Sequence, residues 1–430
     1  MPRSVLDELA AGRGGADAMA RLQAAQHSKV LLLVRALRLL LHDTHPHRTA
    51  VEAAYRVLAD VPPQESRAAL GHPPVAAWAF GTVSLLSSGA APAAYPGLLA
   101  AVAVTAAVRS GVDADLEVPL APGAAGQLDL PGLGTVALPV PTTHARVRTA
   151  GGHATAFAAG EQIDITDGGS TDRRWLPLSR LDVTHGGLPL SLLLDTRTWR
   201  HVPGLRGDQR FGAPPTGLWR SRLDGAWRIL VAHHRPVAEE ISTSLHALVP
   251  IRAPGHRARS GTFHHAFGSV AMSLPPDDRS AAMALAHEIQ HAKLAALTDM
   301  FAIWEPGPTE LFYAPWRTDP RPAAGLLHGT YAHLGVAGFW RRQARVTAPG
   351  PERHRAEVEF ARWTRAAADT ARVLIAQRRL TPVGRHLVEG MAGTLGRWLA
   401  EPVTAQAAAE AHRLLTAHRA RWDRGRAANG

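Results

Sequence analysis

Cysteine is absent from this chain of 430 residues. Its absence excludes disulfide bonds, thiolate metal ligands, iron–sulfur clusters and cysteine nucleophiles, and it fits a reducing compartment. The first residues also lack the charged head and apolar run that mark a signal peptide. From these two absences we expect a cytoplasmic protein.

Lysine and aromatic residues are scarce. Lysine occurs only as Lys29 and Lys293, so the formal net charge of +11 comes almost entirely from arginine. A basic surface can attract acidic peptides or small anions. Aromatic residues make up only 6% of the chain, and no zinc-finger or RNA-binding pattern is present. We therefore expect no nucleic-acid partner.

Long apolar runs are missing as well. The most apolar stretch, residues 98–108, is rich in alanine and too short to cross a bilayer. We expect it to form a buried helix, and we expect no membrane association. The chain is nevertheless long enough for two or three domains, each with its own core.

Periodicity and turn signals divide the chain into three parts. Residues 1–110 have helical patterning, whereas residues 111–207 contain short apolar runs separated by Gly, Asp and Pro, which is typical of a β-rich subdomain. Residues 208–430 return to helical patterning, and we read residues 208–250 as helix that closes at the Leu-Val-Pro of 248–250. The expected fold class is mainly α (α+β), with a helical metal-binding core, a zincin-like HExxH helix and the smaller β-rich subdomain.

The most informative motif is HEIQH at residues 287–291. Positions i and i+4 of a helix share one face, so His287 and His291 can hold one divalent metal together. Glu288 can then reach a metal-bound water or a second ligand.

The sequence around this motif favours a metal site. A strand-like stretch at 267–274 precedes it, and Asp277 and Asp278 are suitable helix N-caps. Residues 280–300 contain no Gly or Pro, and their apolar side chains surround the predicted helix, which indicates burial. A strand followed by a buried HExxH helix is the arrangement of zinc peptidases.

A third protein ligand is expected, because two histidines rarely complete a catalytic site. The metzincin pattern fails, because Leu294 and Leu297 stand where it needs Gly and His. A thermolysin-like site needs a glutamate from the next helix, which we expect to begin near Pro322. No Asp or Glu occurs from there to Pro351.

An all-histidine site is the remaining template, and the second helix carries two histidines. We favour His328 as the third ligand and interpret His333 as an ordinary helix-face residue. Glu305 and Glu310 in the intervening loop are alternative carboxylate ligands, although solvated loop positions suit them better.

The loop between the two helices, residues 313–322 (YAPWRTDPRP), is stiffened by three prolines. It carries Arg317 and Arg321, and an arginine can clamp a carboxylate with two parallel hydrogen bonds. The alternative is a structural ion pair with Asp319. We expect at least one of the two arginines to bind a ligand.

Three blocks in this order resemble the HExxH-motif peptide-modification family, whose members occur in bacterial gene clusters for ribosomally made, post-translationally modified peptides. The match covers about residues 262–345, with weaker similarity at 72–78. The blocks are HEIQHAKL at 287–294, YAPWRTDPRP at 313–322 and LLHGTYA at 326–332.

The resemblance implies an Fe(II)- and α-ketoglutarate-dependent dioxygenase that hydroxylates the β-carbon of a residue in a precursor peptide. The usual iron triad is two histidines and a carboxylate, so three histidines would depart from it. The roles implied are metal binding by His287, His291 and His328, cosubstrate binding by Arg317 or Arg321, ligand orientation by Glu288, and substrate contacts by Trp316 and Tyr331.

The main alternative is a zinc metallopeptidase. The same histidines would bind Zn²⁺, which lowers the pKa of bound water to about 7, and Glu288 would deprotonate that water. A non-catalytic peptide-binding relative is a third possibility. The acid-free second helix and the arginine-bearing loop favour the hydroxylase, and the sequence leaves the oligomeric state open.

Overall fold

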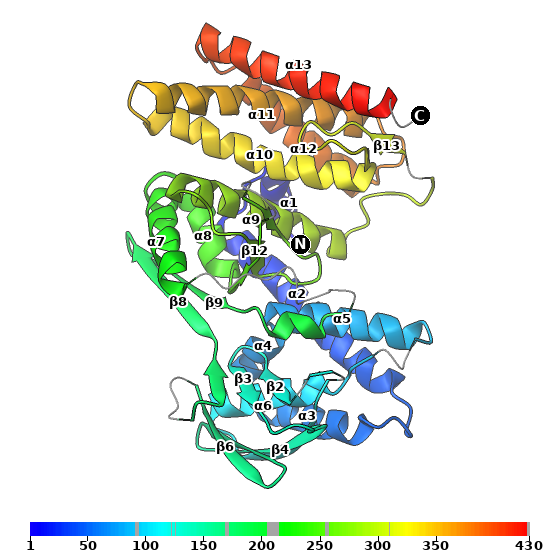
Figure 1. The fold of residues 1–430 in the computed structure, drawn as a ribbon. Helices are drawn as coiled ribbons and strands as arrows, with labels where there is room; N and C mark the ends of the chain where they lie inside the picture. Colours follow the sequence, from blue (N-terminus) through cyan, green and yellow to red (C-terminus); the bar gives the residue numbers. More distant parts are fainter. Residues whose placement is uncertain are drawn as a thin grey trace.

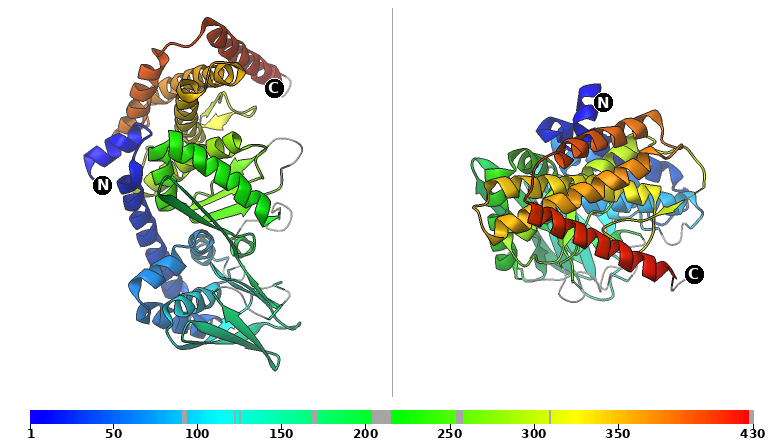
Figure 2. Two further views of the ribbon diagram at one scale, coloured as in Figure 1. Left: turned by 90° about the vertical axis from the view of Figure 1, so that its left-hand side faces the viewer. Right: turned by 90° about the horizontal axis from the view of Figure 1, so that it is seen from above.

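The computed structural model describes residues 1–90, 94–121, 123–124, 126–167, 172–203, 215–253, 258–308 and 310–427. Over these residues the protein is mainly helical with several small sheets, which confirms the predicted α+β class. Figure 1 shows an elongated molecule with two halves, and Figure 2 shows the same division from the side. Residues 208–214 of the predicted helical segment 208–250 lie outside the described residues.

The lower half in Figure 1 combines helices with two antiparallel sheets, of order β1-β4-β5-β6 and β2-β3-β7. Helix α6 (Leu98–Ser110), which is buried from Leu98 to Val108, lies at its centre, as the apolar stretch at 98–108 predicted. The other elements are α3 (Arg48–Asp60), α4 (Pro63–Leu70), α5 (Pro73–Ser87), β1 (Ala114–Pro119), β2 (Gln127–Leu130), β3 (Gly134–Ala137), β4 (His144–Ala150), β5 (His153–Ala158), β6 (Glu161–Thr166) and β7 (Trp175–Pro177).

The upper half contains a mixed five-stranded sheet of order β11-β12-β10-β9-β8 and most of the remaining helices. Its strands are β8 (Ser179–His185), β9 (Leu188–Leu194), β10 (Ala247–Pro250), β11 (Ser260–Gly261) and β12 (Ser269–Met272). Its other elements are α1 (Arg3–Ala10), α7 (Thr216–His233), α8 (Arg235–Ser244), α9 (Asp278–Met300), β13 (Leu311–Phe312), β14 (Arg321–Pro322), α10 (Ala323–Val346), α11 (Pro351–Ile375), α12 (Pro382–Leu399) and α13 (Ala405–Ala427).

Helix α2 (Gly15–Leu40) joins the two halves. Its first turns contribute Met19 and Leu22 to the upper hydrophobic core, and its later turns contribute Val34 and Leu37 to the lower one. Strands β8 and β9 also pack into the upper core, although they precede residue 207. The two cores therefore do not follow the linear division at residues 110 and 207. The upper core also contains residues of α1, α2, β8 and β9, which all precede residue 207.

One predicted element is wrong. The Leu-Val-Pro at 248–250 does not close a helix but belongs to β10, which pairs in parallel with β9 and β12. All four residues of β10 are buried, and a short strand buried on both faces has no alternation that would distinguish it from a helix end.

The HExxH helix forms as predicted. Asp277 caps α9 by accepting a hydrogen bond from the Ser280 backbone N–H at 2.7 Å, and most of the helix is buried. Helix α10 packs against α9 where Gly335 faces it, because a Cβ there would lie 2.5 Å from Gln290 Cγ. Among the described residues, no helix combines the length and apolar character needed to cross a membrane.

A buried ion pair connects α9 to α8. Lys293 is fully buried, and its Nζ lies 2.9 Å from Glu240 Oε2 and 3.1 Å from the Gly12 carbonyl oxygen. Gln290 Nε2 donates to the same carbonyl at 3.1 Å, and Glu240 accepts from the Gly15 backbone N–H. These contacts attach the N-terminal segment to the helix that carries the histidines.

Replacing Lys293 by methionine is expected to lower the free energy of unfolding by about 3–5 kcal/mol, because Glu240 would remain buried without its partner. Urea denaturation followed by circular dichroism measures the change. The double variant Lys293→Met with Glu240→Leu should lose less than the sum of the single variants. Additive losses would show that the two side chains do not stabilise one another.

Candidate metal centre

The two HExxH histidines line a cavity of about 590 Å³. Their Nε2 atoms lie 3.1 Å apart and their ring centroids 4.8 Å apart. A metal at about 2.1 Å from each nitrogen fits this spacing with an N–metal–N angle near 95°. Burial lowers the pKa of His287 to about 4 and that of His291 to about 3, so both rings are neutral at pH 7 and can offer a lone pair.

Glu288 is fixed by two hydroxyl groups. Ser260 Oγ donates to Oε1 at 2.6 Å, and Thr262 Oγ1 donates to Oε2 at 2.7 Å. The carboxylate is buried and lines the cavity, with Oε1 3.9 Å from His287 Nε2. Both of its oxygens therefore already accept a hydrogen bond, which restricts its rotation.

Both histidines of α10 also line the cavity, near different members of the HExxH pair. The His328 ring centroid lies 6.0 Å from that of His291, and the His333 centroid lies 5.4 Å from that of His287. Burial lowers the pKa of His328 to about 4 and lowers that of His333 well below its usual range. All four rings are therefore neutral at pH 7.

His333 is held in one orientation. Its Nδ1 lies 2.8 Å from the Gly329 carbonyl oxygen, which can only accept, so Nδ1 carries the proton and Nε2 keeps its lone pair. Its ring centroid lies 4.3 Å from that of the Trp316 indole and 4.6 Å from that of the Trp363 indole. Metal-ligating histidines are commonly oriented by such a bond from their other nitrogen.

Gly329 makes room for Trp316. A Cβ on this glycine would lie 2.3 Å from Trp316 Nε1, so the indole occupies the space of the missing side chain. The close approach of α10 to α9 occurs at a different glycine, Gly335. Trp316 itself lines the cavity.

The two loop arginines share one carboxylate. Arg317 Nε donates to Asp319 Oδ1 at 2.8 Å, and Arg321 Nη1 donates to Asp319 Oδ2 at 3.4 Å. Both arginines nevertheless line the cavity. The structural ion pair and the ligand-binding interpretation are therefore compatible, because two positive charges face one negative charge.

Tyr331 lies away from the cavity. Its side chain is fully buried in the upper core, its hydroxyl donates to the Leu9 carbonyl oxygen at 2.6 Å, and it is not among the described residues that line the cavity. The expected substrate contact is therefore wrong for this residue, because it faces α1 on another side of α10. Glu305 and Glu310 are exposed loop residues, as we expected.

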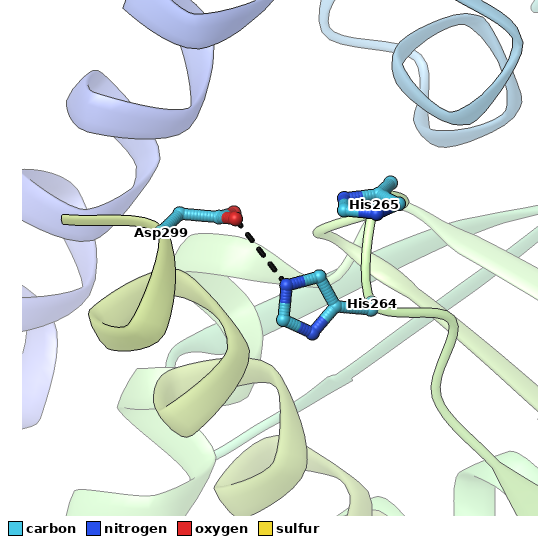
Figure 3. Close-up of side chains that lie close together, drawn as sticks. All are labelled: His264, His265 and Asp299. Carbon is cyan, nitrogen blue, oxygen red and sulfur yellow. Dashed lines mark hydrogen bonds and ion pairs between the residues drawn. The ribbon is translucent and has the colours of Figure 1, made fainter. Parts of the chain in front are cut away.

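A second cluster lies at the C-terminal end of α9, where His264, His265 and Asp299 gather (Figure 3). It is the only group within the described ranges in which three potential ligand atoms all lie within 4.8 Å of one another. The HExxH pair and a third histidine therefore do not meet that spacing. Lys29 Nζ lies 2.7 Å from Asp299 Oδ2 and 3.0 Å from His265 Nδ1. The ammonium group already supplies this cluster with a cation.

The titration of this second cluster follows from those contacts. Burial raises the pKa of Asp299, but hydrogen bonds from His264, Lys29 and Gln26 outweigh burial and lower this pKa below its usual value. Burial, with the charge of Lys29, lowers the pKa of His265 to about 4. At pH 7 the cluster is thus an ion pair beside neutral imidazole rather than a set of free ligands.

Several cavity residues were not predicted from the sequence. Ser260 and Thr262 come from the edge strand β11 and the residue that follows it, and Trp363 comes from α11. None of them stands in a recognisable motif. The adjacent His264-His265 pair was the one signal that could have drawn attention to the segment before β12.

No protein-family model matches this chain, and a search of curated proteins finds no match either. The features that bear on function are therefore the geometry of the site and the resemblance of the three sequence blocks.

Proposed function

We propose that the protein is an Fe(II)- and α-ketoglutarate-dependent dioxygenase that hydroxylates the β-carbon of a residue in a ribosomally made peptide. The observation that supports this most is the pair of Nε2 atoms 3.1 Å apart in a cavity that also presents two arginines. Among the described residues that line the cavity, Glu288 is the only acid. The proposal includes a zincin-like placement of the HExxH helix.

The donor set fits a divalent metal of this kind. Neutral imidazoles suit iron and zinc alike, and they leave the double positive charge of the ion uncompensated. A dianionic cosubstrate would balance that charge. When bound, the iron and α-ketoglutarate together would activate dioxygen for insertion into a C–H bond.

His287 and His291 would hold the metal, and a histidine of α10 would supply the third ligand. His328, predicted from the sequence, stays a candidate beside His291. The structural observations favour His333, because its Nε2 is left free by the bond to Gly329 and because its ring centroid lies 5.4 Å from that of His287, against 6.0 Å between His328 and His291. We therefore propose His333 and keep His328 as the rival.

The arginine pair would bind the distal carboxylate of α-ketoglutarate. Asp319 compensates only one of the two guanidinium charges, so one positive charge remains for the ligand. Arg321 also lies against the first turn of α10, where a Cβ on Gly325 would approach its Nε to 3.2 Å. Asp319 would thus position both side chains without neutralising them.

Glu288 would orient a metal ligand and would offset part of the positive charge of the metal. Its two oxygens accept hydrogen bonds from Ser260 and Thr262, an arrangement that holds a carboxylate in place. A zinc peptidase needs the same glutamate as a mobile base for the metal-bound water. The position of Glu288 beside His287 keeps that second function possible, but the paired hydroxyls and the arginines favour the hydroxylase.

Anaerobic titration of the purified protein with Fe(II) and α-ketoglutarate tests the activity. We expect a metal-to-ligand charge-transfer band, and on admission of oxygen we expect succinate in step with an added hydroxyl on a peptide encoded beside the gene. Zinc-dependent cleavage of that peptide without oxygen would contradict the proposal and support the peptidase.

The third ligand can be assigned from metal retention. We expect His333→Ala to weaken Fe(II) binding about 10- to 100-fold or more, with a smaller effect for His328→Ala. Competition with a chromogenic chelator measures the affinity, and circular dichroism checks that both variants fold. The reverse order of effects would return the role to His328.

Arg321→Ala tests the cosubstrate clamp. The loss of one charge-assisted contact should raise the KM for α-ketoglutarate about tenfold or more, while a saturating concentration restores most of kcat. Arg378, an exposed arginine that does not line the cavity, supplies the control Arg378→Ala. An unchanged KM would assign the clamp to another residue.

A further inference from the structure

We infer that the metal cavity is the middle of a longer cleft, which takes an extended peptide with apolar side chains on one side of the reacting residue and acidic side chains on the other. The inference rests on the proposed peptide substrate. It follows from two further cavities, each of which shares lining residues with the metal cavity.

The first of these cavities is apolar, with a volume of about 590 Å³. It lies between α5 and the segments around Trp199 and Phe263, and Phe80 and Leu85 of α5 contribute to its wall. His264 lines both this groove and the metal cavity, so the two adjoin at this side chain. We call it the apolar groove.

No carboxylate, lysine or arginine is found among the described residues that line the apolar groove. The nearby Lys29 ammonium lies 5.7 Å from the Phe80 ring centroid, but it is paired with Asp299. A charged segment of substrate would lose its hydration there without gaining a partner. The groove therefore suits apolar side chains.

The second cavity is basic, with a volume of about 520 Å³. It shares Trp316, Arg317 and Trp363 with the metal cavity and also presents Arg362 and Arg421. We call it the basic cavity. It is on the side of the site formed by α11 and α13, whereas the apolar groove is on the side formed by α5.

The charges of the basic cavity are only partly compensated. Its three arginines face one lining carboxylate, that of Asp319, which also accepts from Arg321. The Nε atom of Arg362 is buried with no hydrogen-bond partner within the described residues, and the Nη1 atom of the same side chain lies 3.9 Å from Glu359 Oε2. An acidic side chain would supply what these groups lack.

One extended chain is the occupant that fits all three spaces. An extended peptide advances about 3.3 Å per residue, so a short segment can pass the metal centre and place side chains in both outer cavities. A nucleic acid would bring phosphates into the apolar groove, where no cation lines the wall. A small metabolite would not need the outer cavities.

Binding of synthetic peptides to the full-length protein tests this inference. The probe is a fluorescein-labelled peptide of about 14 residues with Leu and Phe in one half and Glu and Asp in the other, made in both orders. A peptide with lysine in place of the acids and one with the same residues scrambled are the comparisons. Anisotropy is read anaerobically, without added cosubstrate.

We expect one order of the segregated peptide to bind about tenfold or more tightly than the lysine and scrambled peptides. Ser84→Glu in the apolar groove and Arg421→Gln in the basic cavity should each weaken binding about fivefold or more. Arg421→Gln should also reduce the salt dependence.

Matched controls lie on the same helices. Ser87 on α5 and Arg424 on α13 are exposed and line neither cavity, so Ser87→Glu and Arg424→Gln should bind like the wild type. Equal binding of all peptides, or equal loss in test and control variants, would overturn the inference. Because no turnover is needed, that failure is distinct from a failure of the proposed oxygenase activity.

Discussion

The position of α9 depends on the buried pair of Lys293 and Glu240. A lysine taken fully out of water must find a counter-charge and hydrogen-bond acceptors, and here these come from α8 and from the carbonyl oxygen of Gly12. Gln290, one helical turn before Lys293, donates a hydrogen bond to the same carbonyl oxygen. Since another face of the same helix carries His287 and His291, these contacts determine where the imidazoles point.

The site combines neutral donors with restrained charges. Burial keeps the imidazoles unprotonated, the hydroxyls of Ser260 and Thr262 hold the Glu288 carboxylate, and Asp319 restrains two arginines while leaving an excess positive charge. This balance suits a cation that needs an anionic cosubstrate. It suits a hydrolytic zinc site less well, because there the glutamate must exchange a proton freely with water.

Local features of the sequence predicted the α9 helix and its cap, the start of α10 and the pairing of His287 with His291, because each depends on residues within one or two turns. Contacts between distant segments could not be predicted in this way. The indole of Trp316 fits over Gly329, and β10 pairs with β9, only because the fold brings separate segments together. Tyr331 was misassigned for the same reason, since its partner is the carbonyl of Leu9.

The most direct test of the central claim is a crystal structure of the Fe(II)-loaded protein with anomalous diffraction recorded at the iron edge. A peak about 2.0–2.2 Å from the Nε2 atoms of both His287 and His291 is the predicted result, with a third imidazole from α10 closing on the same ion. Iron found only among His264, His265 and Asp299, or no ordered iron between the two HExxH rings, would contradict the account.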